Sequence, residues 1–252
     1  MKGQFRTYRG DHNENRFGFF RVEVFESDLH IGVDKLSFVP EMAVSARDEI
    51  IRIRELLNSR IAKDRSFLTS LKPLEMDSSA ESEVQSMLAA GIKAKVGPMA
   101  AVAGLTSEIT GRYLAEKFNI SEIVVENGGD IWASFKEPLF VEILAGNSAL
   151  SGRLALKIPP EMSPLGICTS SGTVGHSLSF GKADAVVICC RDCAVADAFA
   201  TAVCNMVKST GDIEKALQFT ASIPEIISTV IVIGDRIAVS GEFEIVPVLS
   251  AE

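Results

Sequence analysis

The chain alternates between short apolar stretches and longer amphipathic ones, and this pattern predicts strands mixed with helices. Strands are predicted where apolar and polar positions alternate, or where a short apolar run lies between turn residues. Phe17–Asp34 fits two such strands joined by a turn at Glu26-Ser27-Asp28. The other predicted strands are Ile123–Glu126, Asp130–Phe135, Leu139–Leu144, Arg153–Ile158, Ala185–Cys190, Ile227–Ile233, Arg236–Val239 and Phe243–Val248.

Helices are predicted where apolar residues recur every three or four positions. The predicted helices cover residues 41–64, 80–90 with an end at Gly91, 98–118, 194–208 and 212–221. Residues 63–79 are polar and predict a loop or a short broken helix, whereas residues 166–182 are rich in glycine, serine and threonine and predict an ordered loop. Strand pairs and long helices in this order predict an α+β fold, an antiparallel or mixed sheet with helices packed on one face.

Length and charge limit the domain organisation and the partners. The 252 residues, 47% of them hydrophobic, are enough for one domain or for two fused half-size units with buried cores. The net charge of -8 argues against nucleic acid or an anionic membrane as the main partner, because phosphate groups bind to basic surfaces.

The sequence also predicts a cytoplasmic protein. Residues 1–20 contain neither the apolar core nor the small-residue cleavage site of a signal peptide. The longest strongly apolar run, Ile226 to Gly234, is too short to span a bilayer. Four of the five cysteines lie in apolar stretches, where reduced core thiols are found.

The segment Ala194–Ala202 places a carboxylate and a hydroxyl in a frame of small apolar residues. Asp197 and Thr201 lie four positions apart, so on a helix both side chains project from the same face. Their oxygens suit Mg²⁺, which takes few protein ligands and completes its shell with water or phosphate. The alternative is structural: Asp197 charges the first helical turn, and Thr201 packs or bonds back to a carbonyl.

Two further segments carry polar groups beside glycines. Asn127-Gly128-Gly129-Asp130 joins two predicted strands, and Asn-Gly is a strong hairpin signal. Paired glycines also let a backbone approach a planar ligand, with the flanking Asn and Asp as polar contacts. Cys168–Thr173 supplies hydroxyl and N–H groups that could hold phosphate or ribose oxygens, and His176 follows it. Such loops and single histidines are more often structural.

Taken in order, Asn127–Ile131, Thr169–Gly172 and Ala196–Ala202 resemble the ApbE superfamily, with the resemblance extending over residues 95–210. Gly97–Gly104 and Glu26–Leu29 are similar to a shorter branch of that superfamily found in archaea and anaerobic bacteria. The superfamily includes Mg²⁺-dependent flavin transferases, which move FMN from FAD onto a threonine of a target protein. The resemblance implies a duplicated T-fold-like (ApbE-like) fold, with residues 1–252 as a single domain or as two fused T-fold-like units.

The resemblance also implies roles for individual residues. Asp197 and Thr201 would be ligands of Mg²⁺, and His176 would be the catalytic residue. The residues that would line a site for FAD or a related nucleotide are Asn127, Gly128, Gly129, Asp130, Ser171 and Gly172. The partners it implies are a small-molecule flavin or nucleotide, a protein acceptor and further copies of the chain in a homo-oligomer.

The sequence departs from the transferases after the Ser-Gly pair, where they carry His-Ile-x-Asp-Pro-x-Thr-Gly. Only His176 is retained, within Gly175–Asp184. Three functions therefore stay open: FMN transfer or FAD diphosphate cleavage, flavin or nucleotide binding without turnover, and a role in sulfur assimilation or homocysteine formation, with which the branch is associated. For the last, Cys190 and Cys193 form a CxxC pair that could act as a thiol carrier or redox pair, or could be ordinary core residues.

Overall fold

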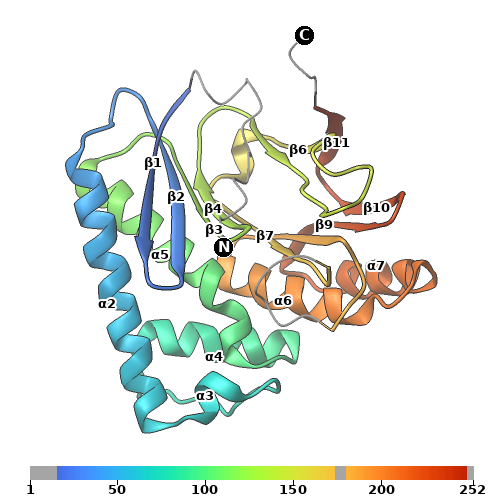
Figure 1. Ribbon diagram of the computed structural model, residues 1–252, viewed down its shortest axis with the longest axis horizontal. Helices are drawn as coiled ribbons and strands as arrows, with labels where there is room; N and C mark the ends of the chain where they lie inside the picture. The colour runs from blue at the N-terminus through green and yellow to red at the C-terminus, as the bar shows by residue number, and fades with distance from the viewer. Residues whose placement is uncertain (1–15, 174–179, 249–252) are drawn as a thin grey trace.

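An eight-stranded antiparallel sheet forms the frame of the molecule (Figure 1). The structure is a computed structural model that describes residues 16–173 and 180–248. All neighbouring strands of the sheet pair antiparallel. In spatial order the strands are β1 (Phe17–Val24), β2 (Ser27–Asp34), β3 (Ile123–Asn127), β4 (Asp130–Ser134), β7 (Leu165–Ser170), β8 (Ala185–Cys190), β9 (Ile226–Ile233) and β10 (Arg236–Gly241).

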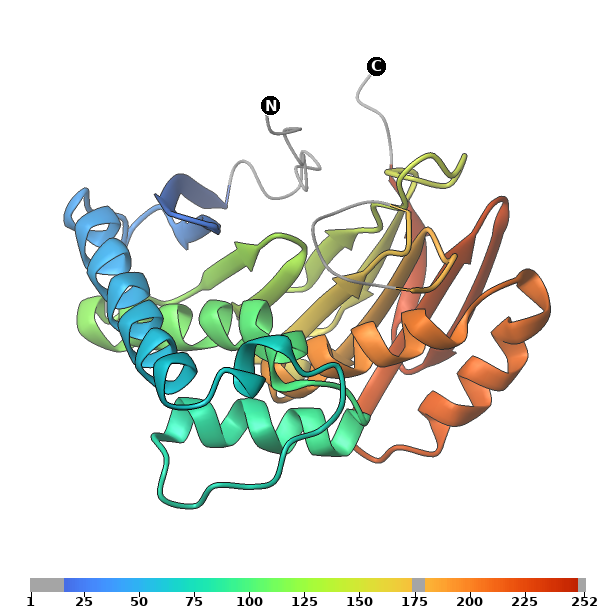
Figure 2. The same ribbon diagram turned by 60° about the horizontal axis from the view of Figure 1, so that its bottom comes forward.

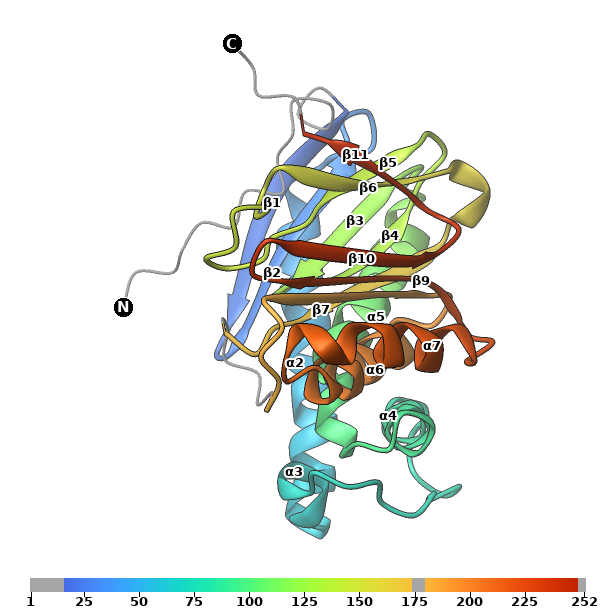
Figure 3. The same ribbon diagram turned by 90° about the vertical axis from the view of Figure 1, so that its right-hand side faces the viewer.

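Helices cover one face of this sheet, and a second, smaller sheet covers part of the other (Figures 2 and 3). The small sheet has the order β11 (Glu244–Pro247), β6 (Leu154–Ile158), β5 (Leu139–Glu142). The α-helices are α2 (Glu41–Lys63), α3 (Ser66–Thr69), α4 (Ser82–Ala94), α5 (Val102–Phe118), α6 (Cys193–Met206) and α7 (Ile213–Ala221). Short 3₁₀ turns are η1 (Pro98–Ala101), η2 (Pro160–Met162) and η3 (Thr210–Asp212).

Within residues 16–173 and 180–248, no single helix is both long and apolar enough to cross a membrane. Taken together, α4 and the following Pro98–Phe118 segment are long and apolar enough, but the two are bent by 103° relative to each other.

Side chains that alternate along the central strands produce two separate cores. Trp132 and Ile188 point toward the helices and belong to the larger core. Ile131 and Val187 point the other way, into the core beneath the small sheet. Since both faces of β8 are buried, its sequence is continuously apolar rather than alternating.

The order of elements repeats across the large sheet. One half contains β1 and β2, then α2 to α5, then β3 and β4; the other contains β7 and β8, then α6 and α7, then β9 and β10. The prediction of an α+β fold with an antiparallel sheet and helices on one face is confirmed. That a single domain arose from two fused units stays a prediction.

Two predictions about strands need correction. The loop predicted over residues 166–182 is wrong for residues 166–170, which belong to β7. Because this stretch is rich in glycine, serine and threonine, its alternation of side chains is not visible in the sequence. In the structure, Leu165 and Ile167 alternate with residues of the other face and lie in the core beneath the small sheet. The hairpin turn is also earlier than Glu26-Ser27-Asp28, because Phe25 takes the left-handed conformation (φ 54°) and β2 has already begun at Ser27.

The predicted end of one helix and the beginning of another also differ from the structure. α4 continues past Gly91 to Ala94, and Lys95 ends it in the left-handed region with φ 59°. Glycine is needed inside this helix because a Cβ at Gly91 would lie 2.9 Å from the carbonyl oxygen of Val96. The segment predicted as a helix over residues 98–118 begins with the 3₁₀ turn η1 before α5 continues to residue 118.

Glycines let α6 approach α5 and the sheet very closely. A Cβ at Gly104 of α5 would lie 2.4 Å from the carbonyl oxygen of Cys193, the first residue of α6. A Cβ at Gly166 of β7 would lie 2.6 Å from the Cα of the same residue. Because these contacts involve backbone, no side-chain rotation relieves them, so both positions require glycine for this packing.

Replacing Gly166 by alanine is therefore expected to destabilise the protein. The added methyl must push α6 away from β7, which costs about 1–3 kcal/mol of unfolding free energy, as overpacking of a core does. Gly211→Ala is the matched control, because its Cβ would meet only the Oγ of Ser209 at 3.5 Å, and it should change stability by less than about 0.5 kcal/mol. Urea unfolding of both variants measures the difference, and equal stability would contradict the close approach.

Candidate functional site

The carboxylate of Asp197 is buried where α6 crosses the beginning of α5. Asp197 is 8% exposed, and its Oδ2 accepts a hydrogen bond of 2.9 Å from the backbone N–H of Gly104. The backbone N–H of Ala103 also donates to this carboxylate. Glycine at 104 is again what allows the contact, since a Cβ there would lie 2.9 Å from the Cβ of Asp197.

The β3–β4 hairpin brings two more of the predicted residues to the same place. Gly128 and Gly129 form its turn with φ of 69° and 113°, a conformation that favours glycine. Directly after the turn, Asp130 is 7% exposed, and its Oδ1 accepts from the backbone N–H of Thr169 at 3.2 Å. Directly before it, the side-chain amide of Asn127 donates to the carbonyl oxygen of Ala103 at 3.4 Å.

The electrostatics of the site are dominated by its two buried acids. Burial and the nearby charge of Asp130 raise the pKa of Asp197 well above its ordinary value. The N–H groups of Gly104 and Ala103 act in the opposite direction but do not outweigh burial. Asp197 therefore resists ionisation as it stands, and a cation bound between the two carboxylates would favour its charged form.

Hydroxyl groups lie on the same helix face and on the adjoining strand. Cys193, Asp197 and Thr201 are spaced by four, so half-buried Thr201 continues the stripe of α6 that faces Gly104 and Gly166. On β7, Ser170 is on the helix side together with Cys168, two residues earlier. Within the described residues, the Oγ of Ser170 is buried and has no hydrogen-bond partner.

This donor set has the chemistry of a Mg²⁺ site rather than a zinc site. Across residues 16–173 and 180–248, no group of three or more His, Cys, Asp or Glu side chains is placed to hold a metal. The site offers instead two carboxylates and neighbouring hydroxyls, all hard oxygen ligands. Mg²⁺ is bound by one or two carboxylates with the remaining positions filled by water and phosphate oxygens, so these residues fit it.

The loop after β7 is tied to other parts of the chain. The Oγ of Ser171 accepts from the backbone N–H of Thr173 at 3.1 Å, and the N–H of Gly172 donates to the carbonyl of Ala183 at 2.9 Å. These bonds hold both residues at the base of the loop, next in sequence to Ser170. His176, the predicted catalytic residue, lies outside the described residues.

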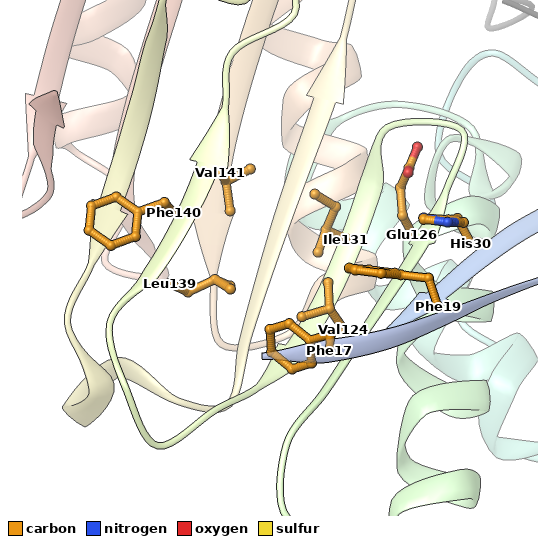
Figure 4. A pocket seen from close by; sticks show the side chains of 9 residues that line it. All are labelled: Phe17, Phe19, His30, Val124, Glu126, Ile131, Leu139, Phe140 and Val141. Carbon is orange, nitrogen blue, oxygen red and sulfur yellow. The ribbon is translucent and has the colours of Figure 1, made fainter. Parts of the chain in front are cut away.

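A pocket that was not predicted lies on the opposite face of the same hairpin (Figure 4). It is a shallow hollow with a cavity volume of about 40 Å³. The rings of Phe19 and His30 are stacked, with their centroids 4.9 Å apart and their planes 2° from parallel. The carboxylate of Glu126 lies beside them. The remaining lining residues are apolar: Phe17, Val124, Ile131, Leu139, Phe140 and Val141.

The only sequence signal for this pocket was the aromatic start of β1, Phe17-Gly18-Phe19-Phe20, which by itself predicts no more than a buried strand. The pocket is formed by residues that are distant in sequence, from β1 to β5. Glu126 connects the pocket to the predicted site. It directly precedes Asn127 on β3, and because side chains alternate along a strand, Glu126 and Asn127 lie on opposite faces of the sheet.

The cysteines form a buried pair different from the one in the CxxC motif. The Sγ of Cys193 lies 3.5 Å from the Sγ of Cys168, and both thiols are free and fully buried. Burial raises the pKa of the Cys193 thiol to about 11 and raises that of Cys190 further still. Since the thiolate is the reactive form, this disfavours Cys190 and Cys193 as a thiol carrier.

Comparison with known proteins identifies the family. The family model AbpE_bact, described as "AbpE bacteria", matches residues 10–242. A UPF0280 protein of Methanocella arvoryzae is 42% identical over 194 residues, which are 77% of this chain and 78% of that protein. A UPF0280 protein of Methanocaldococcus jannaschii is 35% identical over 227 residues, 88% of this chain and 90% of its own.

Solved structures show the same fold at low sequence identity. The flavinyl transferase ApbE of Pseudomonas stutzeri matches with a TM-score of 0.59 and 13% identity, over 89% of this chain and 94% of its own. The flavin transferase ApbE of Vibrio cholerae matches with a TM-score of 0.58 and 11% identity, over 92% and 97%. The chain thus has the fold of the ApbE flavin transferases, and it belongs to the AbpE_bact family together with its UPF0280 relatives.

Proposed function

We propose that this protein binds FAD together with Mg²⁺ and transfers the FMN half of FAD to a hydroxyl group of a protein acceptor, releasing AMP. The observation that carries the proposal is the buried carboxylate of Asp197 close to buried Asp130, a place where ionisation of Asp197 is unfavourable without a cation. The solved structures with this fold that are named flavin transferases support the choice of FAD as the ligand.

The acid pair suits the diphosphate end of the ligand. Two carboxylates and adjacent hydroxyls hold a divalent cation, which in turn binds phosphate oxygens that the acids alone would repel. Ser170, whose buried hydroxyl has no partner among the residues that the structure describes, supplies a hydrogen bond for this end. Mg²⁺ would neutralise the diphosphate and stabilise the departing AMP.

The aromatic pocket suits the ring end of the same ligand. The parallel rings of Phe19 and His30 present a flat apolar surface, and the carboxylate of Glu126 offers an acceptor for a ring N–H. The Gly128-Gly129 turn separates Glu126 of this pocket from Asp130 of the acid pair along the hairpin, and among the described residues a Cβ at Gly128 would meet nothing within 4 Å. A long ligand can therefore pass over the bare turn from one face of the sheet to the other.

The reaction requires positioning more than covalent participation by the protein. The acceptor oxygen forms a bond to the FMN phosphorus, the bond from that phosphorus to the bridging oxygen breaks, and AMP leaves with the bridging oxygen. Asp197 and Asp130, fixed by backbone N–H groups of Gly104 and Thr169, hold the charged end in one orientation. The proton of the acceptor hydroxyl must pass to a base; His176 is the predicted one, and this assignment stays a prediction.

Asp197→Asn is the direct test of the acid pair. The change retains the shape and the acceptor oxygen for Gly104 but removes the charge that holds Mg²⁺, so release of AMP from FAD should fall by at least about 100-fold. Asp192→Asn is the matched control on the same helix, because asparagine also caps a helix and Asp192 contacts only the N–H of Val195 there.

The readout is chromatography of FAD, FMN and AMP with Mg²⁺ and a hydroxyl acceptor present. Wild-type protein that retains FAD but forms no product over time would contradict transfer and would identify a binding module. Equal activity of the Asp197→Asn and Asp192→Asn variants would contradict the role of the acid pair.

Phe19→Ala tests the aromatic pocket separately. Loss of the stacked ring should weaken FAD binding about two- to tenfold while Mg²⁺ binding is unchanged, because the pocket and the acid pair lie on opposite faces of the sheet. Phe219→Ala is the control, since it removes a ring of the same size from α7, where Phe219 packs against Phe199 of α6. Fluorescence titration measures the FAD affinity of both variants. Equal affinities of the Phe19→Ala and Phe219→Ala variants would show that the flavin ring binds outside this pocket.

A further inference from the structure

In the part of the chain that the structure describes, β1 is an edge strand of the large sheet. It is eight residues long and, within the described residues, pairs only with β2 (Figure 1). An edge strand presents a row of N–H and C=O groups that can pair with another strand. β1 contains no proline, and the two charges that it carries, Arg21 and Glu23, are of opposite sign and pair with each other.

Exposed apolar side chains lie beside this edge. Phe38 packs on Phe20 with ring centroids 5.9 Å apart and is still 39% exposed. Val39 is 38% exposed, and Val44, on the first turns of the helix α2 that packs on β1, is 63% exposed. At the far end of the strand, Phe25 is 87% exposed. A free surface with apolar groups at both ends of an open strand indicates an interaction site.

The sequence of β1 is complementary to itself in one antiparallel register. If Val22 lies on a two-fold axis, Arg21 stands opposite the partner's Glu23, and Glu23 stands opposite the partner's Arg21. On the other face, Phe20 stands opposite the partner's Val24, so apolar side chains face apolar ones. Within one copy Arg21 already forms salt bridges with Glu23 at 2.5 Å and with Asp28 at 2.6 Å, and the side chains of Arg21 and Glu23 stay 50% and 60% exposed, so they can also pair across the axis.

We propose that a second copy of this chain binds at β1, forming a two-fold symmetric dimer in which β1 pairs with the partner's β1. A two-fold axis perpendicular to the sheet satisfies the geometry, because it makes the paired strands antiparallel and places the helices of both copies on the same side. In the same register, the exposed patch of Phe38, Val39 and Val44 lies next to the partner's Phe25. Dimer formation therefore removes apolar surface from water.

The test is the mass of the full chain in solution by sedimentation equilibrium, compared with 27.1 kDa for one copy. Wild type is expected at twice that mass. Glu23→Arg and Arg21→Glu each create two like-charge contacts across the axis and should raise the dimer dissociation constant about tenfold or more. The double variant R21E/E23R restores opposite charges across the axis and should restore the dimer.

Glu23→Arg breaks the ion pair with Arg21, and position 23 faces Asp28 across the hairpin, so the new arginine lies beside the carboxylate that Arg21 already binds. The fold should be retained, because exposed ion pairs contribute little to stability. Arg236→Glu, at the first residue of β10 on the other edge of the sheet, is the control and should leave the mass unchanged. A monomeric wild type contradicts the proposal. So does a dimer that both single charge reversals leave intact, or one that the double variant fails to restore.

Discussion

The close approach of α6 to α5 and β7 is the constraint on which the site depends. Gly104 and Gly166 leave no side chain between these elements, so α6 lies with its first turn against both. Only at this separation can Asp197 reach the backbone N–H of Gly104 and come near Asp130 at the end of the β3–β4 hairpin. The packing of small residues and the placement of two buried acids are therefore a single feature of the structure.

Placing these acids together works against stability and in favour of binding. A buried carboxylate near another one destabilises the folded state when it ionises. A protein tolerates this cost where the binding of a ligand offsets it. The aromatic pocket on the other side of the Gly128-Gly129 turn adds a second, apolar half to the same region. Charge at one end and flat rings at the other are what a flavin nucleotide requires.

The sequence predicted those features that repeat within one element. The spacing of Asp197 and Thr201 placed both on one helix face, and Asn127–Asp130 was recognised as a turn between strands. Contacts between distant segments were not predictable in this way. No local pattern connects Ala103 and Gly104 to Asp197, or β1 to β5 around the pocket, because these contacts exist only after the sheet has formed.

The prediction of β7 failed for a different reason. Gly166 and Ser170 favour turns over strands, and they are held in this strand by its burial between β4 and β8. Ser170, predicted to lie in a loop, is instead a strand residue whose hydroxyl is buried, two positions beyond Cys168, which pairs with Asp130 across β4 and β7.

The most direct test of the central claim is the unfolding free energy of wild type and Asp197→Asn across pH, with and without Mg²⁺. Because folding raises the pKa of Asp197, its contribution to stability is present below the ordinary carboxyl pKa and is lost as pH rises through the folded value. Without metal, the Asn variant should therefore be the more stable protein at high pH, and Mg²⁺ should stabilise only wild type. An Asn variant that is less stable at every pH, or equally stabilised by Mg²⁺, would show that Asp197 is structural and does not hold a metal.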